Sequence, residues 1–395
     1  MAKLTDSLGK IPGGLMVIPL LAGAFLNTVD RMYLTPVQRF LRVIGAPSET
    51  REVIIGPEES FRELWENQVV SETTLAETGE RVLEIASFRF LNLGTFSTAL
   101  ASPGILTLIA MFLFCVGAQM DFHVGKRSLK KGLVITLAKL GAAMVVAYLI
   151  AKISGSMYHG FLGLSAMAVI AAMENGNGGM YVALTGEYGN RSDVGAISVV
   201  SLNDGPFFTL LALGMMGEVF PIAAFLAVLL PMGLGFTLAQ IDPKIRQFTA
   251  PGEKLTIPFF AFALGTAMNL GTFLQMEVLG AGLFLALCTI VVTGGAAVLA
   301  LRLFREESPM AGICEASTAG NATQTPVAVA GVMAAGVETG IVSPEKAAIY
   351  QDLVLDATAQ ISISVITTAI ILPFVVIWYD KKLRAKGIDP RKEIP

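Results

Sequence analysis

The sequence predicts an all-α polytopic membrane protein, and three observations support that prediction. Of the 395 residues, 54% are hydrophobic and only 15% are charged, whereas soluble domains carry about 25% charged residues. The mean hydropathy is +0.66. Apolar runs of about 20 residues recur along the chain, the length needed to cross a hydrocarbon core about 30 Å thick. The runs are continuous rather than alternating, which favours helices over a β-barrel.

We expect about ten membrane-spanning helices with both termini in the cytoplasm. The predicted spans lie near 11–29, 103–121, 132–153, 161–185, 194–217, 219–240, 256–275, 278–301, 309–335 and 347–379. Lysine and arginine are enriched in cytoplasmic loops. The segments assigned to the inside hold 18 of them, and the short outside loops hold two. The first run contains Pro12 and Pro19 and lacks a small-residue cleavage site, so we interpret it as a retained span.

A long polar segment, 30–92, separates the first two spans and is predicted to lie outside the cytoplasm. It contains 11 acidic residues, seven arginines and no lysine. The apolar spacing within 36–45 and 56–68 predicts short amphipathic helices. We therefore interpret the segment as a small helical insertion that serves as a structural cap or oligomer contact, with substrate handling as the alternative.

Two pairs of motifs recur at nearly constant distance. FLFCVGAQMDF (112–122) is similar to FFAFALGTAMNL (259–270) at an offset of 148. The Gly-Asn pair at 176–177 matches the one at 320–321 at an offset of 144. Five predicted spans separate the copies, and this odd number places them in opposite orientations. Inverted repeats with interrupted helices are typical of secondary transporters.

The repeat suggests an organisation for the whole chain. Its predicted parts are the N-terminus and first span (1–29), the insertion (30–92), the remainder of the first repeat (93–217), the second repeat (218–379) and a basic cytoplasmic tail (380–395).

Two apolar spans contain clusters of polar residues, AAMENGNGG (171–179) and ICEASTAGNATQTPVAV (313–329). Glycine and asparagine weaken a helix, and a broken membrane helix is tolerated where it lines a cavity. Glycines alone would fit close helix packing equally well. The residues expected to contact a solute are Asn175, Asn177, Asn203, Thr318, Asn321, Thr323 and Gln324. Among them Asn321 and Gln324 rank above the hydroxyls, because serine and threonine often bond back to their own helix.

Ionisable residues within membrane spans indicate function, because each is costly unless paired or hydrated. The candidate coupling-ion residues are Glu174, Asp204, Glu315, Asp356 and Gln360, with Glu174 and Asp204 the leading proton carriers. Supporting polar residues are Asp121, Lys139 and Asn269. Lys139 either neutralises one of the carboxylates or reaches to an interface. The three cysteines and two histidines form no metal-ligand cluster, and we predict no cofactor.

Five sequence motifs together are characteristic, namely KIPGGLMVIPLLAGAFLNT (10–28), LFCVGAQ (113–119), AAMENGNGGMYVAL (171–184), SLNDGPF (201–207) and IPFFAFALG (257–265). In these motifs the sequence resembles the bacterial 2-keto-3-deoxygluconate permease family. The resemblance covers nearly the whole chain except the insertion. It implies a proton-coupled importer of a six-carbon keto-sugar acid in the bacterial inner membrane. It also implies the fold of the bile acid/sodium symporters, in which ten helices form two inverted five-helix repeats, helices 4 and 9 are broken and cross, and a core domain moves against a panel.

This sequence departs from that family pattern in its second polar cluster, which contains Glu315, Asn321 and Gln324, and in Asp356 and Gln360 of the last span. These groups leave sodium as the alternative coupling ion, with Glu174, Glu315 and Gln324 as its candidate ligands.

Other function classes have weaker support. HExxH, GxSxG, paired GxGD-type aspartates and Walker A motifs do not occur, so we predict that the chain is not an enzyme. A sodium-coupled carrier of another organic anion and a solute receptor remain alternatives. The expected partners are a small sugar acid, a proton or sodium ion and the lipid bilayer, with no nucleic acid. The oligomeric state stays open, a homo-oligomer included.

Overall fold

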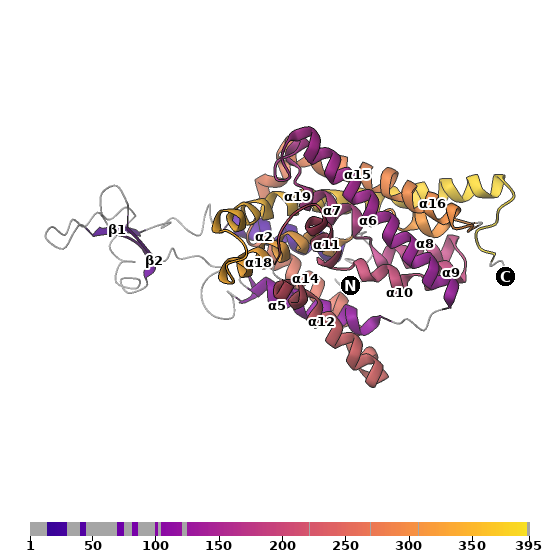
Figure 1. Ribbon diagram of the computed structural model, residues 1–395, viewed down its shortest axis with the longest axis horizontal. Coiled ribbons are helices and arrows are strands. Elements are labelled where there is room, and N and C mark those ends of the chain that lie inside the picture. Colours follow the sequence, from indigo (N-terminus) through magenta and orange to yellow (C-terminus); the bar gives the residue numbers. More distant parts are fainter. Residues whose placement is uncertain are drawn as a thin grey trace.

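The computed structural model describes most of the chain beyond the insertion. The described residues are 14–29, 40–44, 69–74, 81–85, 99–101, 104–120, 125–220, 222–268, 270–306 and 308–392. Figure 1 shows a body of helices with strands β1 and β2 set apart from it.

Helix occupies each of the ten predicted spans. In the first half the helices are α2 (Gly14–Val29), α5 (Ile105–Gln119), α6 (Lys126–Ser154), α7 (Ala166–Glu174), α8 (Gly178–Tyr188), α9 (Arg191–Gly195), α10 (Ile197–Val200) and α11 (Phe207–Met215). In the second half they are α12 (Ile222–Ile241), α13 (Pro243–Thr249), α14 (Gly252–Gly265), α15 (Met276–Cys288), α16 (Gly294–Leu303), α17 (Met310–Cys314), α18 (Thr325–Glu338) and α19 (Pro344–Ala385). Shorter helical turns are η5 (Phe161–Gly163), η6 (Ser201–Asn203), η7 (Leu270–Leu274), η8 (Thr289–Thr293, a π-helix) and η9 (Gly320–Gln324).

Three helices in the described part of the chain are long and apolar enough to cross a membrane unaided, namely Lys126–Ser154, Met276–Leu303 and Pro344–Ala385. The pair Arg191–Asn203 and Phe207–Met215, which is bent by 63°, passes the same test when its two helices are taken together, as a broken span or a re-entrant loop. Shorter apolar helices lie within α2, α5, α12 and α14. The 42 residues of α19 exceed the thickness of a hydrocarbon core at 1.5 Å per residue. Because α19 ends at Ala385, the predicted tail 380–395 begins inside this helix.

The described parts of the insertion form strands, which corrects the prediction of helix at 36–45. Strands β1 (Phe40–Ile44), β2 (Val69–Thr74) and β3 (Arg81–Ile85) form an antiparallel sheet in the order β1-β3-β2. β1 pairs with β3 from Phe40 opposite Ile85 to Ile44 opposite Arg81. The sequences VVSETT and RVLEI are rich in β-branched residues, which favour strands over helices. The helix predicted at 56–68 lies outside the described residues.

The helices of the body pack in two groups. The panel group, as we call it, consists of α2, α5, α12 and α14, in which α5 packs on α12 and α14, and α2 packs on α14. Its apolar cluster includes Leu20, Phe112, Met232, Phe260 and Leu264. The core group contains the helices α6 to α11 and α15 to α19, most of which contribute to two other apolar clusters. The polar segments of the predicted site belong to the core group.

Within the panel group, α2 and α14 approach so closely that their contact positions have no room for a side chain. A Cβ on Gly23 of α2 would overlap the carbonyl oxygen of Phe262 in α14. A Cβ on Gly265 of α14 would likewise overlap the carbonyl oxygen of Leu20 in α2. Small residues allow two membrane helices to meet backbone to backbone.

The contact between α5 and α12 is built in the same way. A Cβ on Gly117 of α5 would overlap the carbonyl oxygen of Met232 in α12, and a Cβ on Gly235 of α12 would overlap that of Phe114 in α5. Both pairs of panel helices are therefore held by reciprocal glycine-to-carbonyl contacts.

Candidate functional site

The first polar cluster interrupts a helix. α7 ends at Glu174, and Asn175 takes an extended backbone conformation with φ −89° and ψ 113°. The side chain of Asn177 then caps α8, since its Oδ1 accepts a hydrogen bond of 3.0 Å from the Met180 backbone N–H. An N-cap residue has non-helical backbone angles, so the two asparagines end one helix and start the next.

The second polar cluster interrupts another helix. α17 ends at Cys314, and the backbone N–H of Ser317 donates to the Glu315 carbonyl at 2.8 Å. Ala319 is extended, with φ −72° and ψ 148°. Helix resumes in η9 and continues as α18, which has Pro326 in its first turn, where the missing N–H costs nothing.

The two interruptions contact each other directly, and we call the region where they meet the junction. The backbone N–H of Ala319 donates to the Asn175 carbonyl at 2.9 Å. The backbone N–H of Asn177 donates to Ser317 Oγ at 3.0 Å. Each interruption thus satisfies backbone or side-chain groups freed in the other, which lipid could not do.

Lys139 of α6 is bound at this junction. Its Nζ donates to the Glu315 carbonyl at 2.9 Å, to Glu315 Oε1 at 3.3 Å and to the Ser317 carbonyl at 3.3 Å. Both side chains of the ion pair are almost completely buried, with exposures of 1% and 0%. A Cβ on Gly176 would overlap the Glu315 carboxylate. Lys139 was predicted either to neutralise a carboxylate or to reach to an interface. In the structure it pairs with the carboxylate of Glu315.

The bend between α10 and α11 supplies a third side of the junction. Asn203 Nδ2 donates to the Glu174 carbonyl at 2.8 Å, and Thr209 Oγ1 donates to Glu174 Oε1 at 2.9 Å. Asp204 Oδ1 accepts a hydrogen bond of 2.9 Å from Asn321 Nδ2. Residues far apart in the sequence are therefore joined by short contacts around the two interruptions.

Hydroxyl groups of α19 complete the junction, and the sequence reading did not single them out. Thr318 Oγ1 lies 2.7 Å from Ser364 Oγ, and the Thr318 backbone N–H donates to Thr368 Oγ1 at 3.1 Å. Thr358 Oγ1 donates to the Thr323 carbonyl at 3.3 Å. The recurrence of Ser and Thr along one span was the available signal for this face.

Several buried polar atoms at the junction have no hydrogen-bond partner among the described residues. They are Glu174 Oε2, Asn175 Oδ1 and Nδ2, Asn203 Oδ1, Glu315 Oε2, Asn321 Oδ1, Gln324 Oε1 and Nε2, and Thr325 Oγ1. A buried polar group without a partner costs about 1–3 kcal/mol, so such a concentration calls for a functional explanation. Amides supply donors and acceptors together, and carboxylates supply acceptors. The set therefore offers both hydrogen-bond donors and hydrogen-bond acceptors to a polar ligand.

Comparison with known proteins identifies the family. A family model described as 2-keto-3-deoxygluconate permease matches residues 84–385. The chain belongs to this permease family. It is 37% identical over 381 residues to 2-keto-3-deoxygluconate permease 1 of Salmonella typhimurium, covering 96% of both chains. It is 30% identical over 388 residues to 2-keto-3-deoxygluconate permease of Bacillus subtilis, covering 97% of this chain and 96% of the relative.

Family membership confirms the resemblance read from the sequence motifs. The members are permeases, so the prediction that the chain is a transporter rather than an enzyme is confirmed. Together with the apolar helices, it makes this chain a multi-pass membrane protein.

Two predicted coupling residues of the permease lie away from the junction. Asp356 is exposed on α19, because residues two positions apart on a helix point in nearly opposite directions and its neighbour Thr358 faces the junction. Gln360 is buried, but its Nε2 donates to the Gly163 carbonyl at 3.4 Å. Thr323 is buried and bonds back to the Gly320 carbonyl at 2.8 Å. Asp121 and Asn269 lie outside the described residues.

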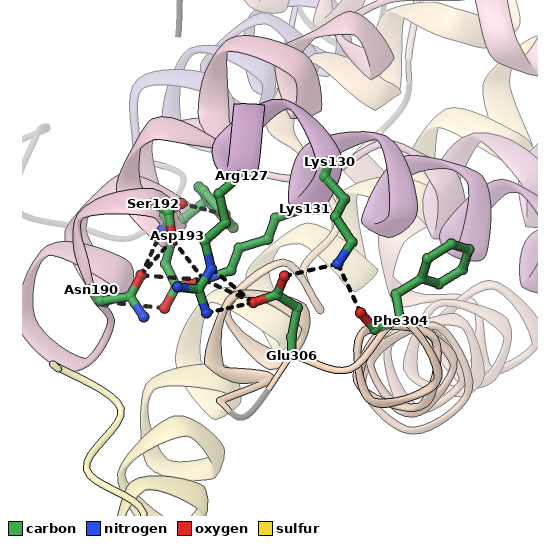
Figure 2. A network of polar contacts seen from close by, with 9 residues as sticks. Arg127, Lys130, Lys131, Asn190, Ser192, Asp193, Phe304 and Glu306 are labelled. Atoms are coloured by element: carbon green, nitrogen blue, oxygen red, sulfur yellow. Dashed lines mark hydrogen bonds and ion pairs between the residues drawn. The ribbon is translucent and has the colours of Figure 1, made fainter. Parts of the chain in front are cut away.

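A second polar network, not predicted from the sequence, surrounds Lys131 near the start of α6 (Figure 2). Lys131 is fully buried and donates to Asp193 Oδ1 at 2.5 Å, Ser192 Oγ at 2.8 Å and Asn190 Oδ1 at 3.2 Å. Asn190 and Asp193 also form a capping box at the start of α9. From the sequence, Lys131 was predicted only as one of the cytoplasmic positive charges, because the sequence does not show which loop contacts the start of a helix.

Glu306 extends this network to the loop after α16. Arg127 Nη2 lies 3.0 Å from Glu306 Oε2, and Lys130 Nζ lies 3.2 Å from Glu306 Oε1. Burial alone would raise the pKa of Glu306, but Arg127, Lys131 and Lys130 outweigh it and hold this pKa below its usual value. The network ties α6, α9 and the α16–α17 loop together, so it strengthens the core group rather than the junction of the two interruptions.

Proposed function

We propose that the chain is a secondary active transporter that imports 2-keto-3-deoxygluconate, or a closely similar sugar acid, by proton symport across the bacterial inner membrane. The observation that carries the proposal is the junction of the two interrupted helices, where unpaired amide and carboxylate atoms are buried together. The identity of the proposed solute comes from the names of the relatives.

In this proposal the solute takes its hydrogen bonds from the junction. The solute's name describes a six-carbon chain with a carboxylate, a keto group and hydroxyls. Asn175 and Gln324 offer both a donor and an acceptor, and Asn321 Oδ1 and Asn203 Oδ1 offer acceptors. The N-terminus of α8 lies directly after Asn177. Its free N–H groups and dipole favour an anion, so it is the proposed position of the solute carboxylate.

Glu174 is the proposed proton carrier. Three carboxylates lie at the junction, but Glu315 is paired with Lys139 and Asp204 accepts from Asn321. Glu174 receives one hydrogen bond, from Thr209, and its Oε2 has no partner among the described residues. Among the described residues no cation forms an ion pair with Glu174, so this side chain is suited to bind and release one proton per cycle.

The reciprocal glycine contacts support the inverted-repeat organisation. Leu20 and Met232 are 212 positions apart, and so are Gly23 and Gly235. The residues that they contact are also separated by a constant distance. Phe114 and Phe262 are 148 positions apart, as are Gly117 and Gly265, and 148 is the offset of the sequence repeat. Each contact of α2 on α14 thus has a counterpart between α12 and α5. The first offset is 64 positions longer than the second, which matches an insertion at 30–92 within the first repeat only.

The packing of the helices supports an elevator-type motion. One apolar cluster is formed mostly by the panel helices, and two others are formed mostly by the core helices, with a few residues of α15 and α19 packed on the panel and Val17 of α2 packed on the core. The two interruptions and the Lys131 network lie in the core group, so these would move together with a bound solute. The proposed orientation has both termini inside and the insertion outside. It agrees with Figure 1, in which the C-terminal end of α19 and the strands lie at opposite ends of the body.

Uptake of labelled 2-keto-3-deoxygluconate into proteoliposomes tests the proposal, with pH and sodium gradients imposed separately. We expect accumulation under an inward proton gradient and none under a sodium gradient alone. Uptake driven by sodium alone would reject proton symport. Absence of both uptake and binding would reject the solute assignment.

A further inference from the structure

The ammonium group of Lys139 has surroundings that would also suit a metal cation. Its three acceptors are oxygens, two from backbone carbonyls of the interrupted helix and one from a carboxylate. Alkali and alkaline-earth cations prefer oxygen ligands, and unwound carbonyls at helix interruptions coordinate sodium in transporters.

The residues around the Lys139 ammonium form a buried, ordered site rather than a surface contact. Lys139, Glu315 and Ser317 are each 1% exposed or less. Gly176 leaves room for the carboxylate, and Asn203 Nδ2 lies 3.5 Å from Glu315 Oε1. The second carboxylate oxygen of Glu315 has no partner among the described residues. A monovalent cation in the place of Nζ would therefore meet carbonyl and carboxylate oxygens with the same total charge as now.

We propose that Lys139 is a tethered cation that fills a monovalent-cation site formed by Glu315 and Ser317, and that it thereby excludes sodium from this position. The inference rests on the proposed transport function and specifies its ion use. The negative charge of Glu315 in the second interruption would then be neutralised by Lys139 in every transport cycle. Of the other carboxylates that face the junction, Asp204 accepts from Asn321, and Glu174 would remain available for a mobile proton.

The proposal predicts that removing the ammonium creates a sodium site. A buried carboxylate that has lost its partner is strongly unfavourable, and a sodium ion can replace the lost charge if the side chain leaves space. The experiment uses the purified full-length protein with Lys139→Ala, and Lys139→Gln as a smaller change should the alanine variant fail to fold. Binding of ²²Na⁺ and thermal unfolding are measured in sodium chloride and in choline chloride of equal ionic strength.

We expect the wild-type protein to bind no sodium saturably and to unfold at the same temperature in both salts. The Lys139 variant should bind ²²Na⁺ saturably and be stabilised by sodium in a concentration-dependent manner, as for any ligand of the folded state. Adding Glu315→Gln to the variant should abolish both effects. Lys126→Ala, an exposed lysine of the same helix, is the matched control and should behave as wild type.

Two results would overturn the inference. One is a folded Lys139 variant that shows no sodium binding, and the other is saturable sodium binding by the wild type that Glu315→Gln removes. Binding of labelled 2-keto-3-deoxygluconate to the wild-type preparation separates this failure from failure of the proposed function. If the wild type binds the solute while the variant binds no sodium, only the tethered-cation inference fails.

Discussion

The backbone N–H of Ala319 donates a hydrogen bond of 2.9 Å to the carbonyl of Asn175. These residues belong to interruptions of two different helices, and 144 positions separate them in the sequence, the same distance as between the repeated Gly-Asn pairs. The bond makes each interruption a partner of the other, so the polar segments form one structural unit.

Glu174→Gln should separate solute binding from proton coupling. Glutamine keeps the shape and can still accept from Thr209, but it cannot release a proton. We expect counterflow exchange of labelled solute to persist while accumulation under a pH gradient falls to the level of empty liposomes. Asp352→Asn, which changes an exposed carboxylate of α19, is the control. Normal accumulation by the Glu174 variant would reject its role as proton carrier.

Gly176→Ala should distort the junction. Its added Cβ would overlap the Glu315 carboxylate, and overpacking of this kind costs about 1–3 kcal/mol. We expect a lower unfolding temperature and slower uptake. Gly186→Ala in α8 is the matched control, because a Cβ there meets nothing within 4 Å and alanine favours a helix. Equal unfolding temperatures for the two variants would contradict the described geometry.

Gly235→Ala should weaken the panel group. The new methyl group would overlap the Phe114 carbonyl, whereas the same change at Gly233, two positions earlier, meets nothing within 4 Å. We expect Gly235→Ala to lower stability by about 1–3 kcal/mol and Gly233→Ala to leave it unchanged or slightly higher. The measurement is the thermal unfolding temperature in detergent. A Gly235 variant as stable as the Gly233 variant would show that α5 and α12 do not meet at this contact.

Glu306→Gln should reduce stability at neutral pH and change its dependence on acid. The lowered pKa of Glu306 means that its contribution to stability is fully present above the ordinary glutamate pKa of about 4.3, which applies in the unfolded state. That contribution is lost as pH falls through the lower pKa of the folded state. The difference between wild type and variant should therefore be large at pH 7, roughly 1–3 kcal/mol for a hydrogen-bonded charge, and should shrink at strongly acidic pH.

Thermal unfolding across this pH range provides the measurement for Glu306. Glu338→Gln, at an exposed position of α18, should show no such difference. A Glu306 effect that stayed constant down to strongly acidic pH would contradict the assignment of the charge to this network.

The sequence predicted the helices well because bilayer crossing demands long apolar runs, and the runs are visible without any knowledge of packing. It also located both interruptions, since asparagine and glycine stop helices wherever they occur in such a run. The strands at 40–44, 69–74 and 81–85 were not predicted, because short segments with mixed apolar spacing fit helix and strand alike.

The candidate site was predicted in part. Glu174, Asn175, Asn321 and Gln324 lie at the junction because they belong to the interruptions themselves. The partners Thr209 and Ser364 were missed, since their contacts join distant parts of the chain and a single hydroxyl in a span carries no distinctive signal. A polar residue in a predicted span also does not show which side of the helix it faces. For this reason Asp356 was predicted at the site, whereas in the structure it is exposed.

The most direct test of the solute junction is Asn175→Ala. Both polar atoms of this side chain are buried without a partner among the described residues, so removing them breaks no internal hydrogen bond. Equilibrium binding of labelled 2-keto-3-deoxygluconate to the purified protein should weaken by about tenfold or more, the equivalent of one lost hydrogen bond of about 1.4 kcal/mol. The unfolding temperature should stay the same or rise. Unchanged solute affinity in a folded Asn175→Ala protein would contradict the account.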